Sequence, residues 1–80
     1  MNIIIVVERD YRISDPDMRD RYIGSVCRTF EEARELVYAH RCRDCDISAS
    51  YVNNGTDYTV YSAETGEIVC EYFVRLIGHD

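Results

Sequence analysis

Hydrophobic and polar positions along the 80-residue chain predict a strand, a loop and a second strand in its first third. Residues 3–7 form an unbroken β-branched run, which is typical of a central strand covered on both faces. Residues 10–20 alternate in charge and contain the only proline, so they predict an exposed loop. Residues 22–27 then predict a short strand, which Gly24 weakens.

The next segment carries the signals of a helix over residues 30–41. Thr29 and Glu32 form a capping-box pattern, in which each side chain accepts a hydrogen bond from a backbone N–H at the helix start. Acidic residues follow in the first turn and arginines lie near the end, as the helix dipole favours. Residues at helical spacing predict the face that packs inward, namely Phe30, Ala33, Leu36, Val37 and His40.

Three strand patterns joined by two tight turns complete the chain, at residues 47–52, 57–63 and 68–77. The Asn54–Gly55 pair in the first turn permits the positive φ of a hairpin. Gly66 in the second turn suits the left-handed position of a bulged turn.

The element order β-β-α-β-β-β predicts an α+β fold, an antiparallel sheet with one helix packed on one face. Eighty residues suit a single small domain spanning residues 1–80. A chain of this length has no room for a cofactor domain beside a substrate domain.

Alternation along the last two strands predicts which side chains face the helix. The inner set is Tyr58, Val60, Ser62, Ile68, Cys70, Tyr72, Val74 and Leu76. The outer set is Asp57, Thr59, Tyr61, Val69, Glu71, Phe73, Arg75 and Ile77. Because one helix covers one face only, this mixed aromatic and acidic outer face predicts a docking surface.

The formal net charge of −6 comes entirely from the second half of the chain. Residues 1–43 hold eight arginines and eight acids, whereas residues 44–80 hold Arg75 against seven acids. Such a field keeps small proteins soluble, and it also attracts a basic partner. Direct binding to nucleic acid is disfavoured, because affinity for phosphates rests on clustered cations.

Cys42 and Cys45 form a C-x2-C pair just after the predicted helix, and His40 precedes them. Structural zinc takes four ligands of this kind, but the other cysteines, Cys27 and Cys70, are scattered along the chain. A redox pair of the thioredoxin type opens a helix, whereas this pair follows one. We therefore expect free cysteines and no bound metal or other cofactor.

The sequence contains no recognisable catalytic motif. Its four glycines make neither a phosphate loop nor a dinucleotide fingerprint, and no G-x-S-x-G elbow is present, so we expect no enzymatic activity. The longest apolar run has five residues, whereas a membrane span needs about 20. Because the chain also lacks a signal-peptide pattern, we expect a cytoplasmic protein, located in the host cell if it is phage-encoded.

Three stretches carry a resemblance of layout: IIIVVERD, TFEEARELV and YTVYSAETGEIVCEYFV. In size, acidity and element order the chain resembles small phage and mobile-element proteins that disarm bacterial defence, notably anti-CRISPR proteins. The resemblance implies stoichiometric inhibition without a cofactor. Such proteins often occupy the Arg- and Lys-lined surface that binds guide or target nucleic acid.

The leading hypothesis is a non-enzymatic binding protein, a phage-type inhibitor of a nucleic-acid-handling defence complex. Acids would mimic phosphates and aromatic rings would anchor the contact, through Asp57, Tyr61, Glu64, Glu67, Glu71 and Phe73. The charged loop of residues 10–20 is a rival contact site. The alternatives are a toxin-neutralising immunity protein, a homodimer or accessory subunit that uses the outer sheet face, and a small zinc module that uses Cys42 and Cys45.

Overall fold

The computed structural model describes residues 1–80 and confirms the predicted order of elements. The strands and helices are β1 (Asn2–Asp10), the 3-10 helix η1 (Pro16–Met18), β2 (Asp20–Tyr22), α1 (Phe30–His40), β3 (Cys45–Val52), β4 (Gly55–Ser62) and β5 (Ile68–His79). The α+β class is therefore confirmed.

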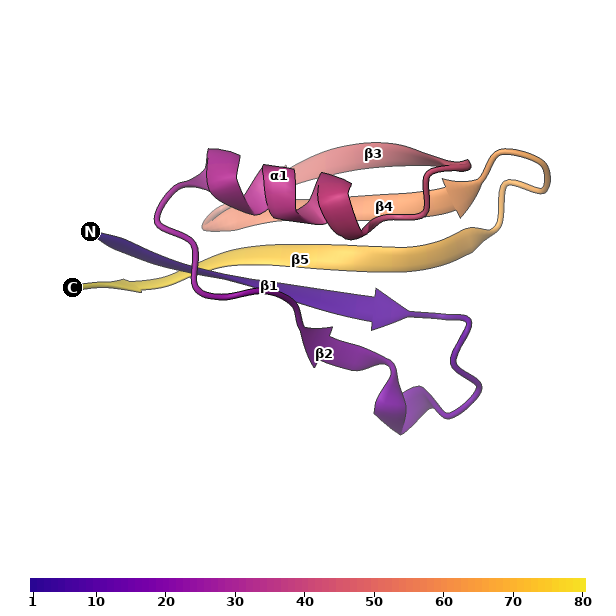
Figure 1. Cartoon of the computed structure of the whole chain (residues 1–80), viewed down its shortest axis with the longest axis horizontal. Coiled ribbons are helices and arrows are strands. Elements are labelled where there is room, and N and C mark those ends of the chain that lie inside the picture. Colours follow the sequence, from indigo (N-terminus) through magenta and orange to yellow (C-terminus); the bar gives the residue numbers. More distant parts are fainter.

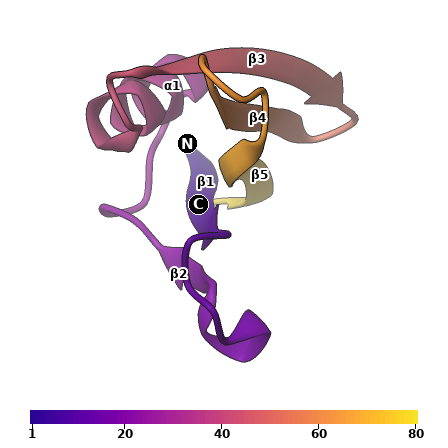
Figure 2. The ribbon, with the colours of Figure 1, turned by 90° about the vertical axis from the view of Figure 1, so that its right-hand side faces the viewer.

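The five strands form one antiparallel sheet in the order β2-β1-β5-β4-β3. Figure 1 shows α1 against one face of this sheet and both chain termini at the same end. In Figure 2, which looks along the long axis, the sheet curves and α1 lies on its concave side. We call the convex side, which carries no helix, the outer face.

The start of α1 is capped as predicted. The Thr29 side-chain oxygen accepts a hydrogen bond from the Glu32 N–H at 3.0 Å. The Glu32 carboxylate reaches back to the Arg28 N–H at 3.1 Å, one residue earlier than a standard capping box. The helix ends where Arg41 turns extended while its N–H still donates to the Val37 carbonyl at 2.9 Å.

The inner face of α1 is narrower than predicted. Ala33 and Val37 are fully buried, and Leu36 packs against them from the side. Phe30 is 41% exposed and His40 is also exposed, so their predicted burial is wrong. Both lie in the terminal turns, and the core residues of the helix lie between them. The helix is neither long nor apolar enough to cross a membrane.

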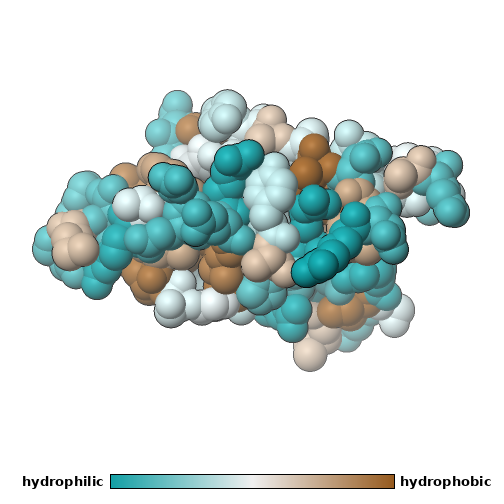
Figure 3. Space-filling view, turned by 45° about the horizontal axis from the view of Figure 1, so that its top comes forward, coloured by the Kyte–Doolittle hydropathy of each residue, from teal (hydrophilic) through white to brown (hydrophobic).

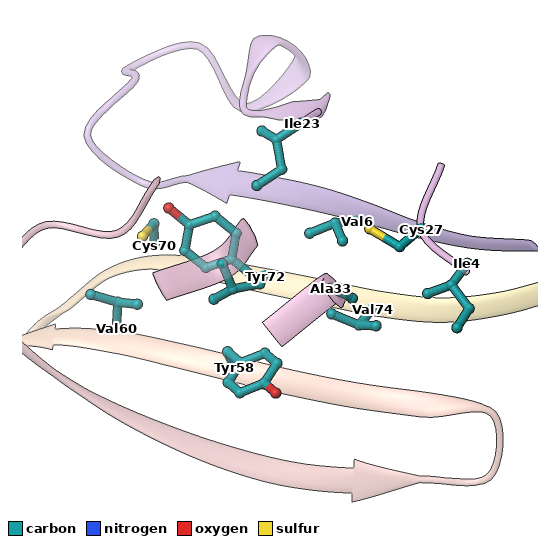
Figure 4. Close-up of a cluster of buried hydrophobic side chains, with 11 residues drawn as sticks. Ile4, Val6, Ile23, Cys27, Ala33, Tyr58, Val60, Cys70, Tyr72 and Val74 are labelled. Carbon is teal, nitrogen blue, oxygen red and sulfur yellow. The ribbon is translucent and has the colours of Figure 1, made fainter. Parts of the chain in front are cut away.

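Eleven side chains form the core between α1 and the concave side of the sheet (Figure 4): Ile4, Val6, Ile23, Cys27, Ala33, Val37, Tyr58, Val60, Cys70, Tyr72 and Val74. The predicted alternation on β4 and β5 is confirmed over most of its length. It fails at Ile68, which is 51% exposed. The register shifts between Val60 and Tyr61, so Ile68 pairs with Tyr61, a residue of the outer face, and leaves the inner row.

A buried carboxylate connects three neighbouring strands. Glu8 of β1 pairs with Arg21 of β2 on one side and with Tyr72 of β5 on the other, and it is only 4% exposed. Arg21 Nε donates to Glu8 Oε1 at 2.8 Å, and the Tyr72 hydroxyl donates to Glu8 Oε2 at 2.7 Å. Figure 4 shows this hydroxyl directed toward β1. Burial, and then the bond to Glu8, hold the pKa of Tyr72 well above its usual range.

The two tight turns use glycine for different reasons. The prediction of positive φ at Asn54–Gly55 is wrong, because only Gly24 and Gly66 have positive φ. Gly55 is the first residue of β4, where a Cβ would lie 1.7 Å from the Val74 carbonyl oxygen. Close approach of two strands therefore requires this glycine. Gly66 has φ +74°, as predicted for the second turn.

The first two strands differ from their predicted form. The run of residues 3–7 lies in an interior strand, as predicted, but only its concave side is covered, and its outer side chains are half-buried. The second strand is β2, not residues 22–27. The positive φ of Gly24 turns the chain there, and Cys27 returns only as an isolated bridge to Ile4.

The buried carboxylate leads to a prediction for Tyr72→Phe. Removing the hydroxyl takes away one of the two donors to buried Glu8, so we expect the free energy of unfolding at pH 7 to fall by about 1.5–3 kcal/mol. Tyr51→Phe is the matched control, because Tyr51 is 84% exposed and should lose nothing measurable.

The stabilities of the wild type and of Tyr72→Phe should also respond differently to alkaline pH. Above the ordinary tyrosine pKa of 10.0, the unfolded chain has released the phenolic proton of Tyr72 while the folded chain retains it. Stability from this group is therefore complete below about pH 10 and lost as the pH rises. Denaturant unfolding from pH 7 to 11 should show the gap between wild type and Tyr72→Phe narrowing. Equal stability at pH 7, or a constant gap, would contradict the role given to this hydroxyl.

Candidate protein-binding site

The structure separates the six residues assigned to partner binding into two groups. They are Asp57 and Tyr61 in β4, Glu71 and Phe73 in β5, and Glu64 and Glu67 in the turn between these strands. The four strand residues are half-buried on the outer face, whereas the two turn residues are exposed. The two groups also differ in what they contact.

Phe73 lies between two arginines on the outer face. Arg9 of β1 and Arg75 of β5 place their guanidinium carbons 4.9 Å and 5.7 Å from the centre of its ring. Arg75 also forms an ion pair with Asp57 of β4, with nitrogen and oxygen 2.6 Å apart. Two cations therefore stand in the middle of the surface that the sequence predicts to be acidic and aromatic.

Glu71 and Asp20 complete this network at its edges. The Tyr11 hydroxyl donates to the Glu71 carboxylate, and this bond raises the pKa of Tyr11. Arg9 forms a two-bond pair with Asp20, at 2.7 and 3.0 Å, which lowers the pKa of the Asp20 carboxyl. Arg9, Arg75, Asp57 and Glu71, the charged groups around Phe73, thus have partners within the chain.

Unpaired acids gather instead at one end of the molecule. We call Asp44, Asp46, Glu64 and Glu67 the acidic end; all four are exposed and none takes part in an ion pair. They lie where α1 connects to β3 and where β4 turns into β5, the end that Figure 2 views. Glu64 and Glu67 belong to the predicted site, and the structure adds two aspartates to them.

Hydrogen bonds fix the turn that carries the two glutamates. The Ser62 hydroxyl accepts from the N–H groups of Glu64 and Thr65, both at 3.3 Å. The backbone of Ser62 closes the turn by donating to the Glu67 carbonyl and accepting from the Gly66 N–H, both at 2.8 Å. The two carboxylates therefore project from an ordered turn.

The aspartates are positioned by the start of β3. Asp46 pairs across the ladder with Tyr61, so a half-buried aromatic ring of the predicted site lies next to this acid. Arg41 holds the preceding link by donating to the carbonyls of Cys42 and Cys45, at 3.3 and 3.0 Å. Both aspartates contribute to the negative charge of residues 44–80, but the sequence pattern did not predict them as part of a binding site. They could have been predicted from their position at the start of the third-last strand. Its hairpin partner ends just before the turn that carries Glu64 and Glu67.

The rival loop of residues 10–20 satisfies most of its own charges. Arg12 forms a two-bond pair with Asp10, at 2.9 and 3.1 Å. Arg19 donates to the Ile13 carbonyl at 2.8 Å and lies over the Tyr11 ring. Only the carboxylates of η1 and its cap, Asp15 and Asp17, have no ion-pair partner there.

The cysteine pair does not join a larger ligand set. No group of three or more His, Cys, Asp or Glu residues is arranged to hold a metal ion. The His40 ring contacts the Leu36 carbonyl at 3.0 Å, within its own helix. A hydrogen bond from the Cys45 thiol, and then the Asp44 N–H, lower the pKa of Cys42, while the same thiol contact raises the pKa of Cys45.

Comparison with protein-family models, with curated proteins and with solved structures gives no match to this chain.

The thiol environments predict an order of chemical reactivity. Cys42 is partly exposed with a lowered pKa, whereas burial raises the pKa of Cys27 and Cys70. With iodoacetamide at about pH 8, peptide mass spectrometry should therefore find Cys42 alkylated first and the two buried thiols last. In denaturant, all four should react at similar rates. If Cys27 or Cys70 of the native protein reacts as fast as Cys42, the described packing is wrong.

Proposed function

We propose that this chain is a small binding protein of the anti-CRISPR type, which acts in the bacterial cytoplasm. It would inhibit a nucleic-acid-handling defence complex by covering the basic surface that holds guide or target nucleic acid. The acidic end is the observation that carries this proposal, because its four carboxylates are exposed and unpaired.

The distribution of ion pairs supports the acidic end over the outer face as the contact. Arg9, Arg12, Arg21, Arg28 and Arg75 each pair with a carboxylate elsewhere in the chain. Breaking such pairs to bind a partner would cost part of the energy gained. The carboxylates of the acidic end lose only water on binding. In the neighbouring link between α1 and β3, Arg41 bonds to backbone carbonyls, so only Arg43 is a cation without a partner within the chain.

The proposed mechanism is competition for phosphate sites. Four carboxylates on an ordered turn and a strand end present negative charge at several points, as successive phosphates of a nucleic acid do. A net charge of −6 also increases the rate of encounter with a basic surface at low salt. Tyr61, half-buried beside Asp46, supplies an aromatic contact next to these charges.

Charge reversal at the acidic end tests the proposal. Cells that carry a CRISPR interference complex should regain plasmid transformation when they express the wild-type chain. The variant with Glu64→Arg and Glu67→Arg should lose this effect, and the purified variant should displace labelled nucleic acid from the complex at least about tenfold less well.

The matched control is the pair Asp17→Arg and Glu35→Arg, which changes the net charge by the same amount at exposed positions without ion pairs. It should inhibit like the wild type. Equal loss in both variants would mean that only net charge matters, and no inhibition across a panel of interference complexes would reject the proposal. A parallel experiment expresses the chain in cells that are exposed to nuclease toxins. If the chain protects cells only in that experiment, it is an immunity protein.

A further inference from the structure

One edge of the sheet has the properties of a strand-pairing surface. β3 is the last strand of the sheet and pairs only with β4. From Ile47 to Val52 it contains no charge, no proline and no bulge, which are the features that protect exposed edges in native sheets. The opposite edge is protected, because β2 has three residues and two of them, Asp20 and Arg21, are charged.

The backbone of every second β3 residue points away from β4. Val52 and Gly55 flank the two-residue turn, and the hydrogen bond of such a turn makes theirs a bonded pair. Bonded and non-bonded pairs alternate along an antiparallel ladder. The N–H and C=O groups of Ile47, Ala49 and Tyr51 are therefore directed to the open side.

Arg41 supports this assignment and leaves the rest of the edge free. Cys45 has the same parity as the three outward residues, and its carbonyl accepts from Arg41 Nη1 at 3.0 Å. None of the backbone hydrogen bonds outside the helix and strand ladders, and none of the side-chain hydrogen bonds, reaches Ile47, Ala49 or Tyr51. Three donors and three acceptors thus remain for another strand.

We propose that β3 pairs antiparallel with β3 of a second copy of this chain, across a two-fold axis at Ala49. In this register Ile47 lies opposite Tyr51 on the helix side of the sheet. Ser48 lies opposite Ser50 on the outer side. Aliphatic–aromatic and hydroxyl–hydroxyl pairs are both favourable across strands, so the edge is complementary to itself.

Charge favours the antiparallel arrangement. Asp46 is the only charged residue of β3 itself, and in the proposed register it lies opposite Val52 of the other copy. The two Asp46 carboxylates are then about 20 Å apart along the strands. This separation exceeds the Debye length of about 8 Å at physiological salt. The two acidic ends lie at opposite ends of the shared edge, so the inference does not depend on the proposed function.

The side chains beside the edge add a limited apolar contact. Tyr51 is 84% exposed, and Phe30 is 41% exposed on the same side of the sheet. Together with Val52 they line a hollow of about 290 Å³. Figure 3, which brings α1 and β3 toward the viewer, shows only small, separate apolar patches. Because a stable complex buries about 800 Å² per partner, we expect this dimer to dissociate on dilution, with a Kd in the micromolar range.

Sedimentation velocity over a concentration series tests the dimer. The wild type should change from monomer at about 5 µM to dimer at about 500 µM. Ala49→Pro removes an N–H that faces away from β4, so it should abolish the dimer while leaving the thermal unfolding midpoint of the monomer nearly unchanged. Ser48→Lys with Ser50→Lys places like charges opposite each other and should also abolish the dimer, even though it makes the net charge less negative by about two.

The control Asp17→Asn with Glu35→Gln makes the net charge less negative by the same amount, away from the edge, and should dimerise at least as well as the wild type. Hydrogen exchange should show the amides of Ile47, Ala49 and Tyr51 protected only at high concentration. A wild type that stays monomeric at about 500 µM would overturn the proposal. So would a dimer that persists in the Ser48→Lys, Ser50→Lys variant, or unchanged exchange at the three amides.

Discussion

The structure depends on the pairing of β5 with a neighbour on each side, β1 and β4. Because both pairings fix the register of β5, each of its side chains can point to only one face of the sheet. Cys70, Tyr72 and Val74 are therefore buried under α1, while Phe73 between them faces out. The same pairing brings Tyr72 to the buried Glu8 carboxylate and brings the Val74 carbonyl so close to β4 that only glycine fits opposite it.

This arrangement also decides which charges are available to a partner. On the outer face the strands place arginines next to acids and rings, so the charges there are balanced within the chain. At the end of the sheet the register shifts after Val60, and β5 begins at Ile68. The turn between β4 and β5 carries Glu64 and Glu67, which form no ion pair with an arginine. The excess negative charge of the sequence is therefore located at an end of the molecule and not spread over the sheet face.

Sequence pattern alone predicted the element order, the helix start and most of the buried row, because capping and alternation are local properties. Thr29 caps α1 as predicted, and Cys70 is buried as parity requires. The errors arise where distant strands decide the outcome. Ile68 leaves the inner row because of a register shift, and the ion pair of Arg75 with Asp57 depends on which strands become neighbours. For the same reason, a charge count identified the acidic half of the chain but not the residues in it that remain unpaired.

The central claim is that the acidic end, and not the outer face, is where this chain meets a basic surface. Titration of the 15N-labelled protein with a peptide of about nine arginines, followed by NMR, tests it without knowledge of the natural partner. The largest chemical-shift changes should occur at residues 44–46 and 64–67, and added salt should reverse them. Changes centred on Asp57, Glu71 and Phe73 would contradict the claim and would return the site to the outer face.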